Sequence, residues 1–482
     1  MSNVHLVVLG AGPGGYSAAF YAADQGYKVT LVDAVDKLGG GCLHSGCIPS
    51  KALLHIAGLM AKARQAKDWG IDFDNPKIDL RRLNEWKEGV VSKVSDGLAL
   101  LCKQRGITYV TGRGVFLGSN TIKISGGQSI TFDRCVIATG SRPVIPGQFN
   151  GSKSVIMDST KALALSSIPE KLLVVGGGYI GLEMGTVYSS LGSRVTIVEV
   201  KDGLLPGVDR DLVRPLQEKL TKEFKAICLG TEIVSIRESG KSGHVVMASA
   251  KESIEDSFDR ILISVGRRPN TDGIGLENTK VELDSDGFVK VDLKRQTSDP
   301  AILAIGDISG EPMLAHKASH EARVAIDGLN GKDVTFGDTV IPALVFTDPE
   351  IAWCGLTELE ARKKNLDFEV ARFPWGASGR AHTLGRTEGS TKLILEPGSK
   401  RLLGVGIVGY GAGELIAEGV LAVNMGAKAD DLSHCIHPHP TLSETVMESA
   451  DVFLGASTHI YKRPRKYVTL NWCTPFRLLV SL

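Results

Sequence analysis

The sequence predicts an α/β protein that contains two copies of one βαβ unit. Each copy begins with a short apolar run, residues 6–9 and 172–175, of the kind that is buried in parallel sheets. The glycine pattern G-x-G-x-x-G follows each run directly, and an acid, Asp33 or Glu199, ends the next apolar run. Each glycine of the first pattern lies 166 residues before its equivalent in the second, and the two acids are separated by the same 166 residues. This constant spacing indicates an internal repeat.

The glycine pattern is typical of a turn that receives the pyrophosphate of a dinucleotide. The first glycine permits the tight turn, the second lets the phosphates approach the backbone, and the third lets helix and strand pack closely. The helix that follows supplies partial positive charge at its N-terminus. The glycines are Gly10, Gly12 and Gly15 in the first copy and Gly176, Gly178 and Gly181 in the second.

The acids suggest which dinucleotides bind. A carboxylate at the end of the second strand accepts hydrogen bonds from ribose hydroxyls, and it repels a 2′-phosphate. Two complete copies predict two bound dinucleotides, and Glu199 favours NAD over NADP in the second copy. Isolated glycine turns are common, but two copies with matched strands, helices and acids argue against a purely structural role.

Length and composition exclude several classes of protein. A chain of 482 residues suggests about three domains, and its net charge of +1 argues against a charge-steered nucleic-acid binder. No apolar run reaches the roughly 18 residues of a membrane span, and the first residues lack the basic flank of a signal peptide. We therefore expect a soluble, cytoplasmic protein without a membrane or nucleic-acid partner.

The segment 38–51 carries the strongest indication of redox chemistry. Cys42 and Cys47 are five residues apart, which is about 7.5 Å along a regular helix and more than the usual Cα separation of about 4.4–6.8 Å in a disulfide. They can pair only if the helix begins irregularly, which the neighbouring glycines permit. Lys51, one turn beyond Cys47, could stabilise a thiolate. The alternative is two unrelated buried cysteines, and the expected core cysteines elsewhere are Cys102, Cys135, Cys228, Cys354 and Cys435.

These segments resemble the pyridine nucleotide-disulfide oxidoreductases, and within that family the branch that oxidises dihydrolipoamide. The resemblance covers roughly residues 4 to 456. It rests on both glycine patterns and on the segments 42–51, 304–307, 312–318 and 437–444. This chain has Gly41 where the family usually has Thr, and His44-Ser45 where the family has Asn-Val. These departures surround the cysteine pair without removing a reacting group.

The resemblance implies two Rossmann-like dinucleotide-binding domains and an α+β dimerisation domain. The FAD-binding domain is expected in two segments, 1–147 and 274–340, on either side of an NAD-binding domain at 148–273. The interface domain is expected at 341–460, followed by a tail at 461–482 that does not match the family well.

The resemblance also implies roles for individual residues. Cys42 would exchange with the dithiol substrate, and Cys47 would lie against the flavin as a thiolate. Lys51 would lie near the flavin and pair with Glu183. The implied FAD contacts are Gly10, Gly12, Gly15, Asp33, Lys51, Gly114, Thr139, Gly140, Ser141, Asp307, Met313, Leu314, Ala315 and His316; the implied NAD contacts are Gly176, Gly178, Tyr179, Ile180, Gly181, Glu183, Glu199, Ile233 and Gly266.

A base is expected near the C-terminus. An acid that orients one ring nitrogen of a histidine makes the other a better proton acceptor, and His439 and Glu444 have the residue types for such a pair. In the family this histidine reaches the disulfide of the other subunit, so the resemblance implies a homodimer. No metal-ligand spacing is present, and His437 is expected to be structural or solvated.

The expected function is oxidation of protein-bound dihydrolipoamide through a redox-active disulfide and FAD, with NAD⁺ as electron acceptor. The expected partner is a lipoyl domain or lipoyl carrier protein of a multienzyme complex. One alternative is a related flavin disulfide reductase: a glutathione-type enzyme would carry basic residues near position 199, and a mercuric reductase a terminal cysteine pair where this tail has Cys473 alone. The other alternative is a non-catalytic flavoprotein subunit.

Overall fold

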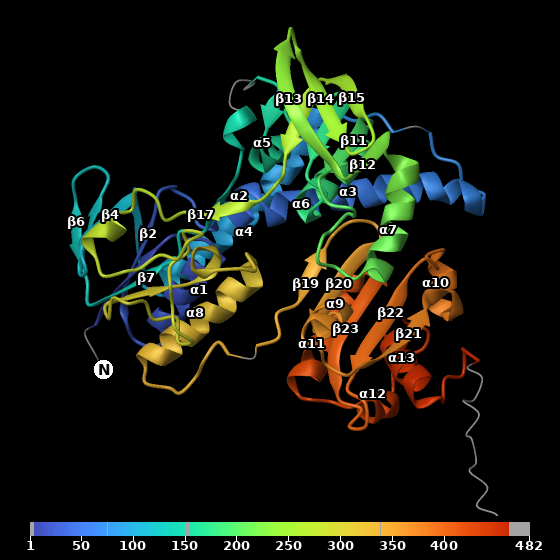
Figure 1. Ribbon diagram of the computed structural model, residues 1–482. Helices are drawn as coiled ribbons and strands as arrows, with labels where there is room; N and C mark the ends of the chain where they lie inside the picture. The colour runs from blue at the N-terminus through green and yellow to red at the C-terminus, as the bar shows by residue number, and fades with distance from the viewer. Residues whose placement is uncertain (1–3, 75, 150–153, 338, 462–482) are drawn as a thin grey trace, which may run out of the picture.

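The computed structural model describes residues 4–74, 76–149, 154–337 and 339–461 (Figure 1). Three bodies are visible: one at the left, one at the top in green, and one at the lower right in orange and red. The tail expected at 461–482, including Cys473, lies outside the described residues except for Tyr461, which is exposed. Among the described residues, no helix has both the length and the apolar character needed to cross a membrane.

The first body is built on a five-stranded parallel sheet with the strand order β18-β7-β1-β2-β3. Successive side chains of a strand face opposite sides of the sheet. Leu6 and Val8 accordingly belong to one hydrophobic core, and Val7 and Leu9 to another on the other side. The strands are β1 (His5–Leu9), β2 (Lys28–Asp33), β3 (Thr108–Thr111), β7 (Arg134–Ile137) and β18 (Ile302–Ala304).

Two layers cover this sheet. Helices α1 (Pro13–Asp24) and α8 (Ala315–Leu329) pack together on one side (Figure 1). On the other side lies a small antiparallel sheet of β4 (Gly114–Gly118), β5 (Thr121–Ile124) and β6 (Ser129–Thr131). Because β18 and α8 come late in the chain, the chain returns to its first sheet after building the second body. This return agrees with a domain made of two segments, whose exact boundaries stay a prediction.

A run of helices connects the first body to the second. It comprises α2 (Gly40–Ser45), α3 (Cys47–Gln65), the 3₁₀ turn η1 (Ala66–Trp69) and α4 (Leu80–Gln104). Helix α3 packs against α6 (Tyr179–Ser190) of the second body, and Leu53 and Met60 of α3 belong to that body's core. The cysteine pair at the α2–α3 junction is therefore supported from both bodies.

The second body repeats the design of the first. Its parallel sheet has the order β12-β11-β10-β16-β9, with α5 (Ser159–Ala164) and α7 (Arg210–Glu223) beside α6. The parallel strands are β9 (Ile156–Met157), β10 (Lys171–Val175), β11 (Arg194–Glu199), β12 (Ala226–Leu229) and β16 (Arg260–Ile263). An antiparallel sheet adds β13 (Thr231–Ser239), β14 (Ser242–Ser249) and β15 (Ser253–Phe258).

Short elements complete the two bodies. The chain enters and leaves the second body through the antiparallel pair β8 (Ser141–Pro143) and β17 (Arg267–Pro269). The 3₁₀ turns are η2 (Gly147–Phe149), η3 (Leu276–Asn278) and η4 (Gly306–Ser309).

The third body is an antiparallel sheet with the order β19-β20-β23-β22-β21. Helices α11 and α13 pack against it around a core that includes Trp375. The strands are β19 (Ala343–Val345), β20 (Glu350–Gly355), β21 (Glu369–Pro374), β22 (Ser390–Leu395) and β23 (Leu402–Gly409). The helical elements are α9 (Glu358–Lys363), η5 (Trp375–Ala377), α10 (Gly379–Leu384), α11 (Ala412–Asn424), α12 (Ala429–His434) and α13 (Glu444–Leu454).

The expectation of five core cysteines is wrong for Cys435. Cys102, Cys135 and Cys354 are buried, as expected. Cys228 is partly buried and packs against a hydrophobic core, whereas Cys435 is exposed because it lies in the loop that directly follows α12.

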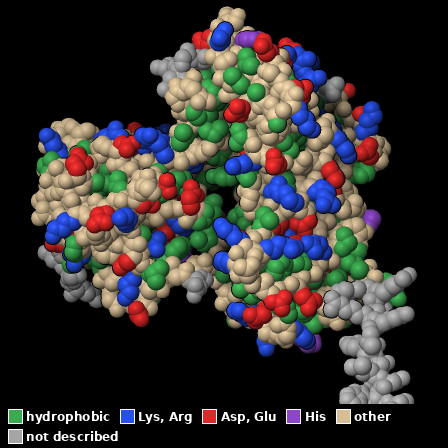
Figure 2. Space-filling view, viewed as in Figure 1, with side chains coloured by type: hydrophobic (Ala, Val, Ile, Leu, Met, Phe, Trp, Pro, Cys, Tyr) green, Lys and Arg blue, Asp and Glu red, His purple; other side chains and the backbone are tan. Residues whose placement is uncertain are grey.

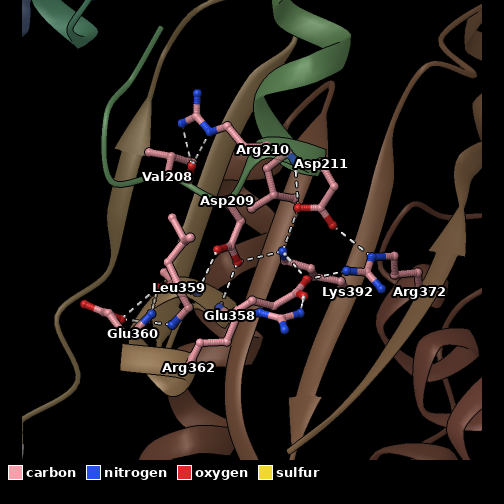
Figure 3. A network of polar contacts seen from close by, with 12 residues as sticks. Val208, Asp209, Arg210, Asp211, Glu358, Leu359, Glu360, Arg362, Arg372 and Lys392 are labelled. Carbon is pink, nitrogen blue, oxygen red and sulfur yellow. Dashed lines mark hydrogen bonds and ion pairs between the residues drawn. The ribbon is translucent and has the colours of Figure 1, made fainter. Parts of the chain in front are cut away.

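A buried cluster of ionic groups joins the second body to the third (Figure 3). The Nζ of Lys392, on β22, lies 2.7 Å from Asp209 Oδ2, 2.7 Å from Asp211 Oδ1 and 3.0 Å from Glu358 Oε1. The three carboxylates form a group of the kind that can hold a metal ion, but the ammonium of Lys392 already contacts all three. Asp209 also accepts hydrogen bonds from the first backbone N–H groups of α9. Figure 2, drawn from the same side, shows Lys, Arg, Asp and Glu side chains gathered where these two bodies meet.

Candidate active site

A cavity with a volume of about 590 Å³ lies between the first two bodies. This is within the range of about 300–1,000 Å³ that is usual for cofactor pockets. Figure 2 shows the surface hollowed where the first body meets the others. The first glycine turn, both cysteines of the α2–α3 junction and the start of α6 line the cavity together. The residues that the sequence marks as the redox centre therefore share one space.

Two glycine turns are shaped to admit a dinucleotide. Gly10 has φ +106°, and a Cβ there would lie 2.3 Å from the carbonyl oxygen of Ala138. Gly176 has φ +112°, and its Cβ would lie 2.4 Å from the carbonyl oxygen of Ser264. Only glycine is compatible with both the positive φ and the close approach. Helices α1 and α6 begin directly after these turns, and no side chain caps the N-terminus of either helix, so their first turns can receive phosphates.

The acids of the repeat anchor their own glycine turns. Asp33 Oδ2 accepts a hydrogen bond of 2.6 Å from Ala11 N–H, and Glu199 Oε2 accepts one of 2.7 Å from Gly177 N–H. Each acid accepts a second bond, of 3.0 Å and 2.8 Å respectively, from the backbone N–H two residues after itself. A carboxylate has more lone pairs than these bonds use, so both acids can still accept from ribose hydroxyls. The anchoring role was not expected from the sequence.

The two cysteines meet because the helix is broken between them. Helix α2 ends at Ser45, Gly46 has φ −145° and ψ −112°, and α3 begins at Cys47. A Cβ on Gly46 would lie 2.9 Å from the carbonyl oxygen of Gly41 and 3.3 Å from the Cα of Cys42, so glycine allows the close approach. The irregular helix that the spacing of the cysteines requires is therefore confirmed. Cys42 and Cys47 are both free thiols in this structure.

The pair is electrostatically asymmetric. The Cys42 thiol donates a hydrogen bond to Cys47, which raises the pKa of Cys42 and lowers the pKa of Cys47 to about 7. Burial acts to raise the pKa of Cys47, whereas the positive charge of Lys51 acts to lower it. Cys47 is therefore the preferred thiolate, and Cys42 stays protonated until a base removes its proton.

Lys51 is held by groups from two other bodies. Its Nζ lies 2.8 Å from Glu183 Oε2, on α6, so the expected contact between these residues is confirmed. The same Nζ lies 4.4 Å from the centre of the Phe346 ring. Phe346 directly follows β19, and its backbone N–H donates to Glu183 Oε1 over 3.1 Å.

His439 and Glu444 are brought together away from the cavity. His439 Nδ1 lies 2.9 Å from Glu444 Oε1, which confirms the expected contact. Burial acts to raise the pKa of Glu444, but hydrogen bonds from Thr441 N–H and from His439 outweigh it and lower that pKa. His439 is exposed, and neither it nor Glu444 is among the described residues that line the cavity of Cys42. His437 instead pairs with Glu418, at 2.8 Å.

Comparison with known proteins identifies the family. Residues 4–322 match the model of the pyridine nucleotide-disulphide oxidoreductases, and residues 341–450 match the dimerisation domain of the same proteins. The chain belongs to this family. A dihydrolipoyl dehydrogenase of Vibrio parahaemolyticus is 44% identical over 462 residues, which cover 95% of this chain and 97% of the relative. Another, of Bacillus subtilis, is 41% identical over 460 residues, with coverage of 95% and 97%.

Solved structures share the fold. LpdA of Mycobacterium tuberculosis superposes with a TM-score of 0.86 at 26% identity, covering 93% of this chain and 99% of that one. The HOCl-induced flavoprotein disulfide reductase RclA of Escherichia coli gives a TM-score of 0.83 at 26% identity, with coverage of 93% and 99%.

Most of the residues expected to contact FAD line this cavity. Asp307 accepts a hydrogen bond of 2.5 Å from Ser141, and Ser141 accepts one of 2.8 Å from Arg267. Gly15 lies beneath the turn, and His316 contacts the carbonyl oxygen of Pro342 at 2.8 Å. The cavity is lined by the expected residues Gly10, Gly12, Asp33, Lys51, Thr139, Gly140, Ser141, Asp307, Met313 and Ala315; Gly114 lines an adjoining cavity of about 430 Å³, and Gly15, Leu314 and His316 line neither.

The expected NAD contacts lie partly in this cavity and partly outside it. Tyr179, Ile180 and Glu183 line the cavity from the start of α6. The side chain of Ile233 is buried in a hydrophobic core, and the neighbouring Val234 is exposed instead, because side chains alternate along β13. The remaining members, Gly176, Gly178, Gly181, Glu199 and Gly266, do not line that cavity. Direct contact of each residue with a cofactor stays a prediction.

The departures from the family pattern bond to local backbone. His44 Nε2 lies 2.9 Å from the carbonyl oxygen of Leu38, and Ser45 donates to the carbonyl oxygen of Gly41 over 3.4 Å. A Cβ on Gly41 would meet nothing closer than 3.9 Å, so the backbone here does not require glycine for want of space at Cβ.

Sequence reasoning missed the support of the turn that carries Asp307. Glu321, fully buried on α8, accepts a hydrogen bond of 2.6 Å from Gly306 N–H. It also contacts Arg295 at 2.9 Å and Lys317 at 3.1 Å. The available signal was the spacing of Lys317 and Glu321, which are four residues apart and of opposite charge.

Proposed function

We propose that this chain acts as a dihydrolipoyl dehydrogenase, which oxidises dihydrolipoamide to lipoamide and reduces NAD⁺ to NADH. The observation that carries the proposal is the pair of cysteines, which line one cavity together with Lys51, the first glycine turn and the start of α6. Relatives of 41–44% identity over nearly the whole chain bear the same name. The cofactors are FAD and NAD, for the first and second glycine turns respectively.

The thiols divide the chemistry between them. A thiolate of dihydrolipoamide attacks Cys42 of the oxidised pair, the Cys42–Cys47 bond breaks, and Cys47 leaves as a thiolate. The low pKa of Cys47 and the charge of Lys51 favour this leaving group. The second substrate thiolate then displaces Cys42 and closes the lipoamide disulfide, leaving both cysteines reduced. The residues of the first glycine turn would hold FAD in this cavity, and bound FAD would supply the redox chemistry that transfers the two electrons of the pair to NAD⁺.

A base must remove the substrate's thiol protons, because a thiol with a pKa of about 8.5 is only a few per cent ionised at pH 7. We assign this role to His439, whose ring is oriented by Glu444. Its exposure and its distance from the cavity lining support an arrangement in which it serves the cysteine pair of a second subunit. The dimerisation domain supports a homodimer. The lipoyl-bearing partner and the cytoplasmic location stay predictions.

The buried carboxylate of Glu199 favours NAD over NADP in the second turn. A glutathione-type enzyme that depends on NADPH is therefore less consistent with the structure.

The test is formation of NADH by the purified FAD-loaded protein with dihydrolipoamide and NAD⁺. Turnover is expected with dihydrolipoamide, and none with NADPH and glutathione disulfide. Cys42→Ser should abolish turnover, whereas the matched control Cys228→Ser should retain it, because Cys228 lies outside the cavity. The proposed substrate is wrong if the protein does not oxidise dihydrolipoamide but acts on another dithiol or disulfide.

A further inference from the structure

Residues from α3, the second body and the third body meet at the ammonium group of Lys51. Lys51 lies on α3, Glu183 lies on α6, and Phe346 follows β19 in the dimerisation domain. The ammonium is 2.8 Å from Glu183 and 4.4 Å from the centre of the Phe346 ring. The Phe346 N–H binds the other oxygen of Glu183 over 3.1 Å, so one residue contacts both members of the ion pair.

We propose that Phe346 is a positioning residue for the redox centre, which holds the Lys51 ammonium in place beside Cys47. The proposal rests on the proposed function, because it assigns Cys47 as the thiolate that Lys51 stabilises. The dimerisation domain would then help to stabilise the Cys47 thiolate, although neither cysteine of the pair belongs to that domain.

The physical basis is the electrostatics of an aromatic face. The negative face of the ring attracts a cation within about 6 Å, and the contact strengthens as water is excluded. Glu183 is nearly completely buried, Phe346 is half-buried, and the Lys51 side chain is 29% exposed, so only part of the ammonium can be hydrated. Without the ring, the ammonium gains water and rotamer freedom. Its average attraction for a thiolate at Cys47 then weakens.

The chain contains a matched contact further along the same helix. Lys62, also on α3, places its Nζ 4.7 Å from the centre of the Tyr410 ring, which also belongs to the third body. Lys62 lies three turns beyond Lys51, and neither Lys62 nor Tyr410 lines the cavity of the cysteines. Loss of the Tyr410 ring therefore removes a cation–π contact between α3 and the third body, together with the hydrogen bond of 3.1 Å from Lys62 to the Tyr410 hydroxyl, at a place that does not line the cavity of the cysteines.

The experiment uses the FAD-loaded protein in a Cys42→Ser background, where Cys47 is the remaining thiol of the pair. The long-wavelength absorbance of a thiolate beside oxidised FAD is titrated against pH and reports the pKa of Cys47 directly. Phe346→Leu should raise this pKa by about half a unit, the size expected for a partly exposed cation–π contact. Phe346→Tyr should restore the original value, and Tyr410→Leu should leave it unchanged.

Phe346→Met provides a second variant without the ring but with similar volume, in case the leucine variant folds poorly. The proposal is overturned if the leucine and methionine variants titrate as the parent protein does. It is also overturned if Tyr410→Leu shifts the pKa equally, because the effect would then be a general loosening of the third body. The titration contains no dihydrolipoamide, so failure of the proposed function would appear separately in the turnover assay.

Discussion

Replacement of Lys392 by methionine tests how the second and third bodies are held together. Lys392 is almost completely buried, and its ammonium is the centre of the cluster formed with Asp209, Asp211 and Glu358 (Figure 3). Methionine has a similar length but no charge. In Lys392→Met, the three carboxylates at the junction therefore lose the positive charge that lies among them.

The structure sets the expected size of this effect. Removing one partner of a buried ion pair costs about 3–5 kcal/mol. Asp211 and Glu358 are 31% and 14% exposed, and Arg372 still contacts both, so we expect the lower end, about 3 kcal/mol. If the second and third bodies unfold together, they form a unit of about 150–250 residues, for which a loss of about 3 kcal/mol corresponds to a fall of about 6–12 °C in the melting temperature.

The assay is thermal unfolding of the FAD-loaded protein. The melting temperature is taken from the first transition, because a chain of several domains does not unfold in a single two-state step. Lys332→Met is the matched control, since Lys332 pairs with Asp327 at the surface, and it should change the melting temperature little. Adding Asp209→Asn to Lys392→Met should recover part of the loss. It removes one carboxylate charge, while the asparagine oxygen can still accept from the N-terminus of α9.

The pH dependence has a definite sign. Burial acts to raise the pKa of Asp211, but Lys392 and Arg372 outweigh it and hold that pKa below its usual range. The stabilisation is therefore present above the pKa of an unfolded aspartate, about 4, and is lost as the pH falls through the lower folded value. The difference in melting temperature between the parent protein and Lys392→Met should stay at its full size from pH 7 down to about pH 4, and it should narrow below pH 4. A gap below 2 °C at pH 7, or one that widens on acidification, would refute the reasoning.

Three further predictions concern the chemistry. Cys47→Ser should abolish the long-wavelength absorbance seen on two-electron reduction, whereas Cys42→Ser should leave a thiolate that shows it; persistence of the band in the Cys47 variant would contradict the assignment. Glu199→Gln, which keeps an acceptor for the glycine turn, should raise kcat/KM for NADP⁺ relative to NAD⁺ by about tenfold, and an unchanged ratio would show that the charge does not discriminate. His439→Gln should slow reduction by dihydrolipoamide by about 10²–10⁴-fold. Oxidation of NADH by an artificial acceptor should survive in that variant; if both fall in a folded dimer, His439 is structural.

The parts of the site that are local in the chain could be predicted well. A glycine turn and its acid belong to one βαβ unit, so spacing alone reveals the pattern that ends in Asp33 and in Glu199. The separation of Cys42 and Cys47 likewise required an irregular helix, and the break at Gly46 provides it. The contacts of Lys51 with Glu183 and of His439 with Glu444 were implied by family resemblance, and the structure confirms both contacts while their catalytic roles await tests.

The sequence by itself thus determined the repeated dinucleotide turns and the cysteine segment, because short-range backbone requirements leave a readable spacing. Only the tertiary structure decided that Phe346 faces Lys51 and that Lys392 lies among three carboxylates. It also decided that Ile233 is turned into a core and that Cys435 is exposed. These outcomes depend on how whole sheets and helices pack against one another. Such packing joins residues far apart in the chain, and it leaves no period or motif along the sequence.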